Sequence, residues 1–107
     1  MAIEGSALTL GRARGAAWIG QTLDLSVAVQ IDSGSSESAL CADADVFYSE
    51  SRQDPARVRV TQEPGAEPDS VLLRVVASAI VDEPVVTVYL RAGCLQKVTR
   101  KYVLLAD

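Results

Sequence analysis

The chain has 107 residues, with 14 acidic against 10 basic residues and a net charge of -4. This is the length of one domain, which buries roughly two thirds of its unfolded surface and can fold without a cofactor. The basic residues are scattered along the sequence, which argues against nucleic acid as a partner, because phosphate binding needs a concentrated basic face.

No apolar run approaches the roughly eighteen residues that a membrane span needs, so we expect no membrane insertion of this segment. Residues 1–6 show no charged and apolar signal-peptide regions, and we interpret them as an expression or signal-peptide-proximal remnant. Residues 7–107 are then expected to form a single β-sandwich domain.

The N-terminal part predicts two strands. Residues 7–13 alternate weakly and predict the first, with Gly11 at a bulge or a close backbone approach. Gly15 and Gly20 then indicate a turn-rich connection. Residues 21–31 predict the second strand, because apolar side chains recur with a period of two, the strongest such pattern in the chain. These residues are Leu23, Leu25, Val27, Val29 and Ile31.

A loop at residues 32–37 separates the second strand from a third at residues 38–48. One face of the third strand is apolar and carries Leu40, Ala42, Ala44, Val46 and Tyr48. The opposite face carries Cys41, Asp43, Asp45 and Phe47, which indicates either a bulge in mid-strand or a face that is wet in the middle. Asp43 and Asp45 are candidate catalytic carboxylates or calcium ligands, but an alternating acidic pair is more often a solvent face.

The second half of the chain predicts three to four further strands. Residues 49–56 form a polar loop, residues 57–61 a short strand with valines inward and arginines outward, and residues 62–69 a loop punctuated by Pro64 and Pro68. Residues 70–78 predict a central strand covered on both sides. Residues 80–94 and 97–107 then predict a β-hairpin.

Six or seven short strands, frequent turns and no helical periodicity indicate an all-β fold, an antiparallel immunoglobulin-like β-sandwich of about seven strands. Trp18 precedes both cysteines, whereas a conventional immunoglobulin domain has its tryptophan between them. The core motif of that family is therefore not expected.

Cys41 and Cys94 are too far apart for a C-x-x-C motif, and the chain has no His to complete a metal site. The remaining readings are two buried thiols or a disulfide that joins the final hairpin to an earlier strand. We expect the disulfide, which implies an oxidising compartment.

Several motifs, taken in order, resemble the N-terminal periplasmic domain of FimV-type proteins. They are Leu10-Gly11-Arg12, Gly20-Gln21-Thr22-Leu23-Asp24, Glu83-Pro84, Gly93-Cys94 and Arg100-Lys101-Tyr102-Val103-Leu104-Leu105-Ala106-Asp107. The resemblance covers most of the chain. It implies a bacterial envelope protein linked to type IV pilus assembly and cell-pole organisation, with this domain in the periplasm as part of a larger exported or membrane-anchored protein.

The main functional hypothesis is a non-enzymatic protein-interaction or scaffolding domain whose partner is another envelope protein. The candidate surface comprises Tyr89, Arg91, Arg100 and Tyr102, residue types that are enriched at interface hot spots. The alternative is that the tyrosines pack in the core and the arginines are only solvated. A sheet edge could also accept a partner strand or hold a weak homo-oligomer.

The second hypothesis is a peptidoglycan- or carbohydrate-binding module, for which Trp18 is the best stacking residue. An enzyme is the weakest hypothesis. The usual general base is missing because the chain has no His, and the serines and cysteines lack the context of a nucleophile. We therefore expect no catalytic residues, no cofactor and no metal.

Overall fold

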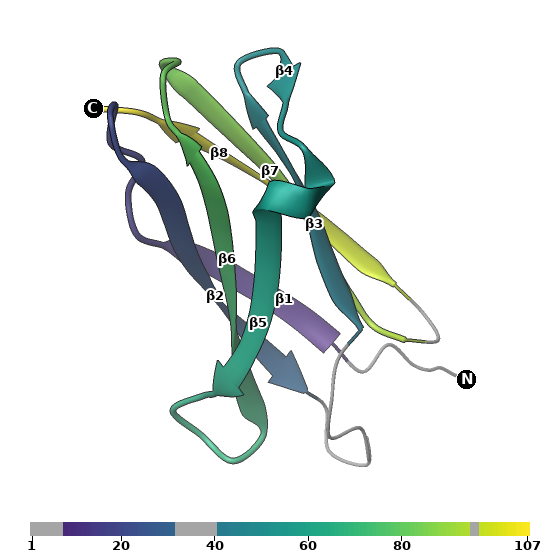
Figure 1. The fold of residues 1–107 in the computed structure, drawn as a ribbon. Helices are drawn as coiled ribbons and strands as arrows, with labels where there is room; N and C mark the ends of the chain where they lie inside the picture. The colour runs from purple at the N-terminus through teal and green to yellow at the C-terminus, as the bar shows by residue number, and fades with distance from the viewer. Residues whose placement is uncertain (1–7, 32–40, 95–96) are drawn as a thin grey trace.

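The computed structural model describes residues 8–31, 41–94 and 97–107, which form eight β-strands and one turn of 3-10 helix (Figure 1). The elements are β1 (Leu8–Arg14), β2 (Thr22–Ile31), β3 (Ala42–Tyr48), β4 (Ser51–Arg52), the 3-10 turn η1 (Pro55–Arg57), β5 (Val58–Pro64), β6 (Ser70–Ile80), β7 (Val85–Ala92) and β8 (Val98–Leu105). The segment 1–6, the expected loop at 32–37 and residues 38–40 of the expected third strand lie outside the described residues.

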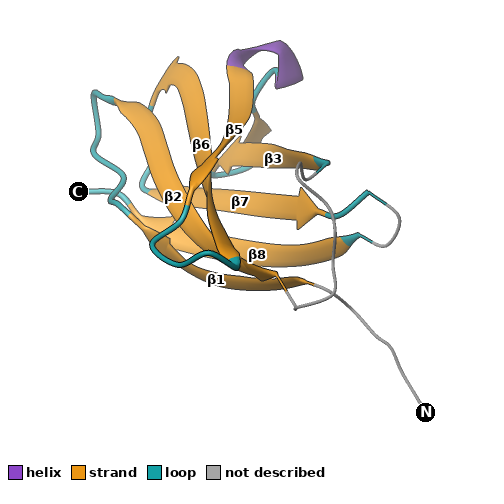
Figure 2. Cartoon of the chain, turned by 90° about the horizontal axis from the view of Figure 1, so that it is seen from below, coloured by secondary structure: helices purple, strands orange, loops and turns teal. Residues whose placement is uncertain are grey.

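The strands form two antiparallel four-stranded sheets with the orders β1-β2-β6-β5 and β4-β3-β7-β8. Figure 2 shows β2, β6 and β5 crossing the direction of β3, β7 and β8. This is the strand order of immunoglobulin-type sandwiches, in which the first, second, fifth and fourth strands share a sheet, here with β4 added beside β3. The predicted all-β sandwich is confirmed, with eight described strands instead of about seven.

The core lies between the two sheets and is built by strands that alternate between apolar and polar residues. In β2, Leu23, Leu25, Val27 and Val29 are at most 1% exposed and Ile31 is half-buried, while the alternate positions are polar or small and mostly exposed. The predicted face of β2 is therefore confirmed. The fully buried side chains of both sheets include Leu23, Leu25, Val27, Val29, Val46, Tyr48, Leu73, Val75, Val86, Val88 and Leu90.

β6 is central, as predicted, because it pairs with β2 on one side and with β5 on the other. The expectation that it is covered on both sides is wrong. Its outward residues Arg74 and Ser78 are exposed, whereas Leu72 and Val76 are half-buried. Polar residues of β5 lie opposite these two outward positions, Glu63 opposite Leu72 and Arg59 opposite Val76.

Two predicted loops contain secondary structure. β5 continues through Pro64, so residues 62–64 are strand and only the remainder is a loop. A proline is tolerated there because β5 is the edge strand of its sheet. Within residues 49–56, β4 pairs with the end of β3, and the side chain of Asp54 accepts a hydrogen bond from the Ala56 amide at 2.9 Å to start η1.

Gly11 shows both features expected of it. The β1–β2 register shifts between Leu10 and Ala13, which is a bulge. A Cβ atom at Gly11 would lie 2.9 Å from the carbonyl oxygen of Ala28, so the backbones approach closely there. Gly15 and Gly20 have positive φ angles of 112° and 91° in the connection to β2, as a turn-rich segment requires.

β3 has an unbroken register with β7, from Ala42 opposite Ala92 to Tyr48 opposite Val86. The mid-strand bulge is therefore excluded. The middle of the outer face is polar, but only Asp43 is well exposed to solvent, because Asp45 is 26% exposed and paired with arginines. The predicted hairpin is also confirmed, because β7 pairs with β8 along its whole length.

Cys41 and Cys94 form a disulfide, which confirms the predicted link between the hairpin and an earlier strand. Cys41 directly precedes β3 and Cys94 follows β7, its neighbour in the sheet, so their Cα atoms are only 4.8 Å apart. The Gly93 amide donates a hydrogen bond to the Cys41 carbonyl at 3.0 Å. Disulfides persist mainly in oxidising compartments, so the bond indicates an exported domain.

Candidate interaction surface

The four residues predicted as an interaction surface fall into two separate groups. Tyr89 and Arg91 lie on β7 and face outward from the β4-β3-β7-β8 sheet, where both are partly buried. Arg100 and Tyr102 lie on β8 and reach across to β1, the edge strand of the other sheet. The structure therefore does not bring the four together on one face.

Arg100 and Tyr102 close one side of the sandwich. The Tyr102 hydroxyl donates to the Gly11 carbonyl at 2.6 Å, and Arg100 donates to the carbonyls of Leu10 and Gly11 at 2.8 and 3.1 Å. The Arg100 guanidinium also lies 5.1 Å from the centre of the Tyr102 ring. These contacts give the carbonyls of Leu10 and Gly11, at the start of the β1 bulge, side-chain hydrogen-bond donors, and Tyr102 is only 7% exposed.

Replacing Tyr102 with Phe is expected to lower the free energy of unfolding by about 1 kcal/mol, because the hydrogen bond to Gly11 is lost while the ring remains packed. Urea unfolding followed by circular dichroism measures this change. The matched control is Tyr89→Phe, for which we expect less than about 0.5 kcal/mol because Tyr89 is partly exposed at the surface. Equal losses in the two variants would contradict this role of Tyr102.

Arg91 holds the two aspartates of β3. Its guanidinium donates to Asp43 at 2.8 Å and to Asp45 at 3.1 Å, and Arg52 of β4 donates to Asp45 at 2.8 Å. Hydrogen bonds from Arg52 and Arg91 lower the pKa of Asp45 below its usual range, against the opposing effect of partial burial. A general acid needs a raised pKa, so Asp45 has the character of an ion-pair partner. Among the described residues no group of three or more potential metal ligands comes together.

The lowered pKa of Asp45 makes its contribution to stability depend on pH. The contribution is complete above the ordinary aspartate pKa of about 3.9 and is lost as the pH falls through the lower pKa of the folded state. Replacing Asp45 with Asn should therefore destabilise the domain by roughly 1 kcal/mol at neutral pH and by much less near pH 2. Urea unfolding at both pH values tests this, with the exposed Asp82→Asn as control. An equal effect of Asp45→Asn at the two pH values would contradict it.

Tyr89 forms a small aromatic group beside this network. Its ring is nearly perpendicular to the Phe47 ring at a centroid distance of 5.9 Å, and the Lys101 ammonium lies 5.8 Å from the centre of the Tyr89 ring. These three residues line a hollow of about 140 Å³ together with Ser49 and Thr87. The outer face of β7 therefore changes along its length from charged to aromatic.

Among the described residues, the large apolar side chains that remain exposed belong to three segments that meet at one end of the sandwich, which we call the apolar end. Its members and their exposed fractions are Trp18 (48%), Ile19 (49%), Ile80 (57%), Val103 (57%) and Leu105 (76%). Figure 1 shows the C-terminus, the β1–β2 connection and the β6–β7 connection at this same end. The sequence analysis did not predict this surface. The pair Leu104-Leu105 is the signal that could have indicated it, because two consecutive residues of a strand point to opposite faces and one of two apolar side chains is then exposed.

Backbone hydrogen bonds hold the apolar end in place. The Ile19 amide donates to the carbonyl of Asp107, and the Asp107 amide donates back to Ala17, at 2.8 and 3.0 Å. The Gly20 amide donates a hydrogen bond to the Val81 carbonyl at 2.8 Å, which joins the β1–β2 connection to the residue that follows β6. Three segments that are distant in the sequence therefore present their apolar side chains from a fixed framework.

No protein-family model matches the chain, and no curated protein matches its sequence. What points to a function is therefore the geometry of the molecule itself. No helix among the described residues has the length and apolar character needed to cross a membrane.

Proposed function

We propose that this chain is a non-enzymatic protein-interaction domain of a bacterial cell envelope and that the apolar end is its docking surface. The observation that carries the proposal is that three segments meeting at one end of the sandwich carry large apolar side chains that are 48 to 76% exposed: Trp18, Ile19, Ile80, Val103 and Leu105. Single exposed apolar residues are ordinary on proteins, but a group of them at one place marks an interaction site.

The composition of the apolar end suits a protein partner. Tryptophan is among the residues most enriched at interface hot spots, and flanking aliphatic side chains exclude water around it. The hydrogen-bonded framework of residues 17–21, 81–84 and 105–107 means that little backbone entropy is lost on docking. A partner would therefore find a surface that is already formed.

The proposal also covers the cellular compartment of the domain and its relationship to FimV-type proteins. The disulfide supports an exported domain, and we assign it to the periplasm on the resemblance to FimV-type N-terminal domains. Segments that carry the resemblance, Leu10-Gly11-Arg12 and the Arg100 to Asp107 stretch, contact each other through Arg100 and Tyr102. A role in type IV pilus assembly or cell-pole organisation belongs to the same proposal.

Replacing Leu105 with Asp is the direct test, because this side chain is 76% exposed and its loss should leave the fold intact. We expect the recovery of the envelope partner in a pull-down to fall roughly tenfold, as for a hot-spot residue. The matched control is Thr99→Asp, which places the same charge on the same face of β8 at its other end. Equal recovery with both variants, each folded by circular dichroism, would refute the apolar end as the docking surface.

A peptidoglycan- or carbohydrate-binding module is the second candidate, favoured by the 48% exposure of Trp18 in a connection between strands. A sugar ring stacked on this indole would change its emission. Tryptophan fluorescence is specific here because the chain has a single Trp. A saturable change on titration with peptidoglycan fragments supports this candidate, and an unchanged spectrum removes it.

A further inference from the structure

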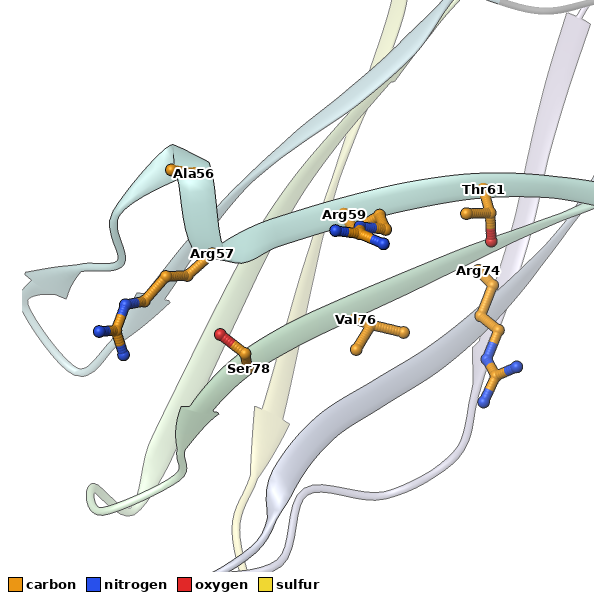
Figure 3. Close-up of a pocket in the computed structure, with 7 residues that line it drawn as sticks. All are labelled: Ala56, Arg57, Arg59, Thr61, Arg74, Val76 and Ser78. Carbon is orange, nitrogen blue, oxygen red and sulfur yellow. The ribbon is translucent and has the colours of Figure 1, made fainter.

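Three arginines line a hollow of about 380 Å³ on the outer face of the β1-β2-β6-β5 sheet, which we call the arginine hollow. Figure 3 shows Arg57 of η1 at one end, Arg74 of β6 at the other, and Arg59 of β5 between them. The other lining residues are Ala56, Thr61, Val76 and Ser78. The hollow therefore lies on the sheet opposite to the one that carries Tyr89 and Arg91.

The unbalanced positive charge of the arginine hollow lies on Arg57 and Arg59. Arg74 donates two hydrogen bonds to Asp24 and lies 3.9 Å from Glu63, so its charge is already balanced. Within the described part of the chain, the side chains of Arg57 and Arg59 have neither a hydrogen-bond acceptor nor an acidic partner. Two guanidinium groups thus remain available in a chain whose net charge is -4.

The spacing of these two arginines favours an extended ligand. Arg57 and Arg59 are two residues apart and Val58 between them has an extended backbone, so their attachment points are roughly 6.6 Å apart along the chain. Alternate side chains of any extended peptide have the same spacing. A guanidinium group matches a carboxylate with two parallel hydrogen bonds.

The remaining lining residues suit carboxylate side chains. Val76 lies directly opposite Arg59 on β6 and gives the hollow an apolar floor for the methylene groups of a glutamate. The hydroxyl groups of Thr61 and Ser78 can donate hydrogen bonds to the same carboxylates. A nucleic acid would need a longer row of cations than the two that are available here.

We propose that the arginine hollow binds an acidic, extended segment of a partner protein with carboxylate side chains at alternating positions. The proposal rests on the proposed function in that the partner is a protein. It names a second contact surface, which is separate from the apolar end in its residues and its chemistry. Charge complementarity at Arg57 and Arg59 selects the segment, and its binding weakens as salt rises.

The test is a nuclear magnetic resonance titration of the domain with the peptide Val-Glu-Val-Glu-Val-Glu at low salt, which follows the arginine side-chain Nε–H signals. We expect saturable shifts at Arg57 and Arg59. The double variant Arg57→Gln with Arg59→Gln should weaken binding roughly tenfold. The matched control is Arg12→Gln with Arg14→Gln, which removes the same charge at the same spacing from exposed positions of β1, and it should change the affinity less than twofold.

Three outcomes would overturn the proposal: no saturable shift at Arg57 or Arg59, equal weakening by both double variants, or tighter binding of inorganic phosphate or of a single-stranded oligonucleotide at these arginines. Failure here remains distinguishable from failure of the proposed function, because the Leu105→Asp variant leaves the arginine hollow unchanged. Peptide binding by that variant should equal that of the wild type.

Discussion

Replacing both Cys41 and Cys94 with Ser is expected to lower the free energy of unfolding by about 4 kcal/mol. The disulfide joins residues separated by 53 positions, and a cross-link over a loop of this size removes much conformational freedom from the unfolded chain. A small domain has a total stability of roughly 5 to 15 kcal/mol, so this is a large fraction. Urea unfolding of the double variant and of the wild type measures the difference.

Reduction of the disulfide in the wild-type protein supplies an internal control. Wild-type protein treated with a reductant should unfold at the same urea concentration as the double variant. In both cases the m-value should exceed that of the oxidised protein, because the unfolded chain without the cross-link exposes more surface. A loss of stability below about 1 kcal/mol in the double variant would contradict the assigned role of the bond.

Replacing Tyr48 with Ala is expected to destabilise the domain by about 3 to 5 kcal/mol, the range for a large buried aromatic side chain. Tyr48 is 2% exposed and is the largest of the fully buried side chains. Its hydroxyl donates to the Ala79 carbonyl at 2.8 Å, so one residue of β3 fills the core and also ties it to β6 in the other sheet.

The Tyr48→Phe variant separates the two contributions, and it is useful if Tyr48→Ala does not fold. It keeps the ring in the core and should lower the free energy of unfolding by only about 1 kcal/mol, the value of the hydrogen bond. Val103→Ala, at a position that is 57% exposed, is the control, with an expected change below about 0.5 kcal/mol. A Tyr48→Ala loss as small as that of the control would contradict the central position of Tyr48.

The strands could be predicted from the sequence where one face is buried and the other is exposed to solvent. β2 shows this most clearly, because every second residue from Leu23 to Val29 is buried and the residues between them are partly or fully exposed. The disulfide and the hairpin followed from residue types in the same way. By contrast, β4 has only two residues and no periodicity, and the strand character of residues 62–64 depends on pairing with β6 and not on local preference.

Surfaces were harder to predict because they are set by register between distant strands. Tyr102 and Arg100 are residue types that are common at hot spots. In the structure, however, both donate hydrogen bonds to carbonyls of β1 and close one side of the sandwich. Arg74 is distant in the sequence from Arg57 and Arg59, and only the β5–β6 pairing brings it to the same hollow. The apolar end likewise combines the β1–β2 connection with the ends of β6 and β8, which no local sequence pattern relates.

The central claim is that the apolar end contacts a protein in the cell envelope. Its most direct test is a photoreactive amino acid placed singly at positions 18, 105, 12 and 99 of the full-length protein in its own cells, followed by irradiation and mass spectrometry. Trp18 and Leu105 belong to the apolar end, while Arg12 and Thr99 are exposed positions elsewhere on the sandwich. We expect cross-links to the same envelope protein from positions 18 and 105 and none from 12 or 99. Cross-links of equal yield at all four positions, or none at 18 and 105, would contradict the claim.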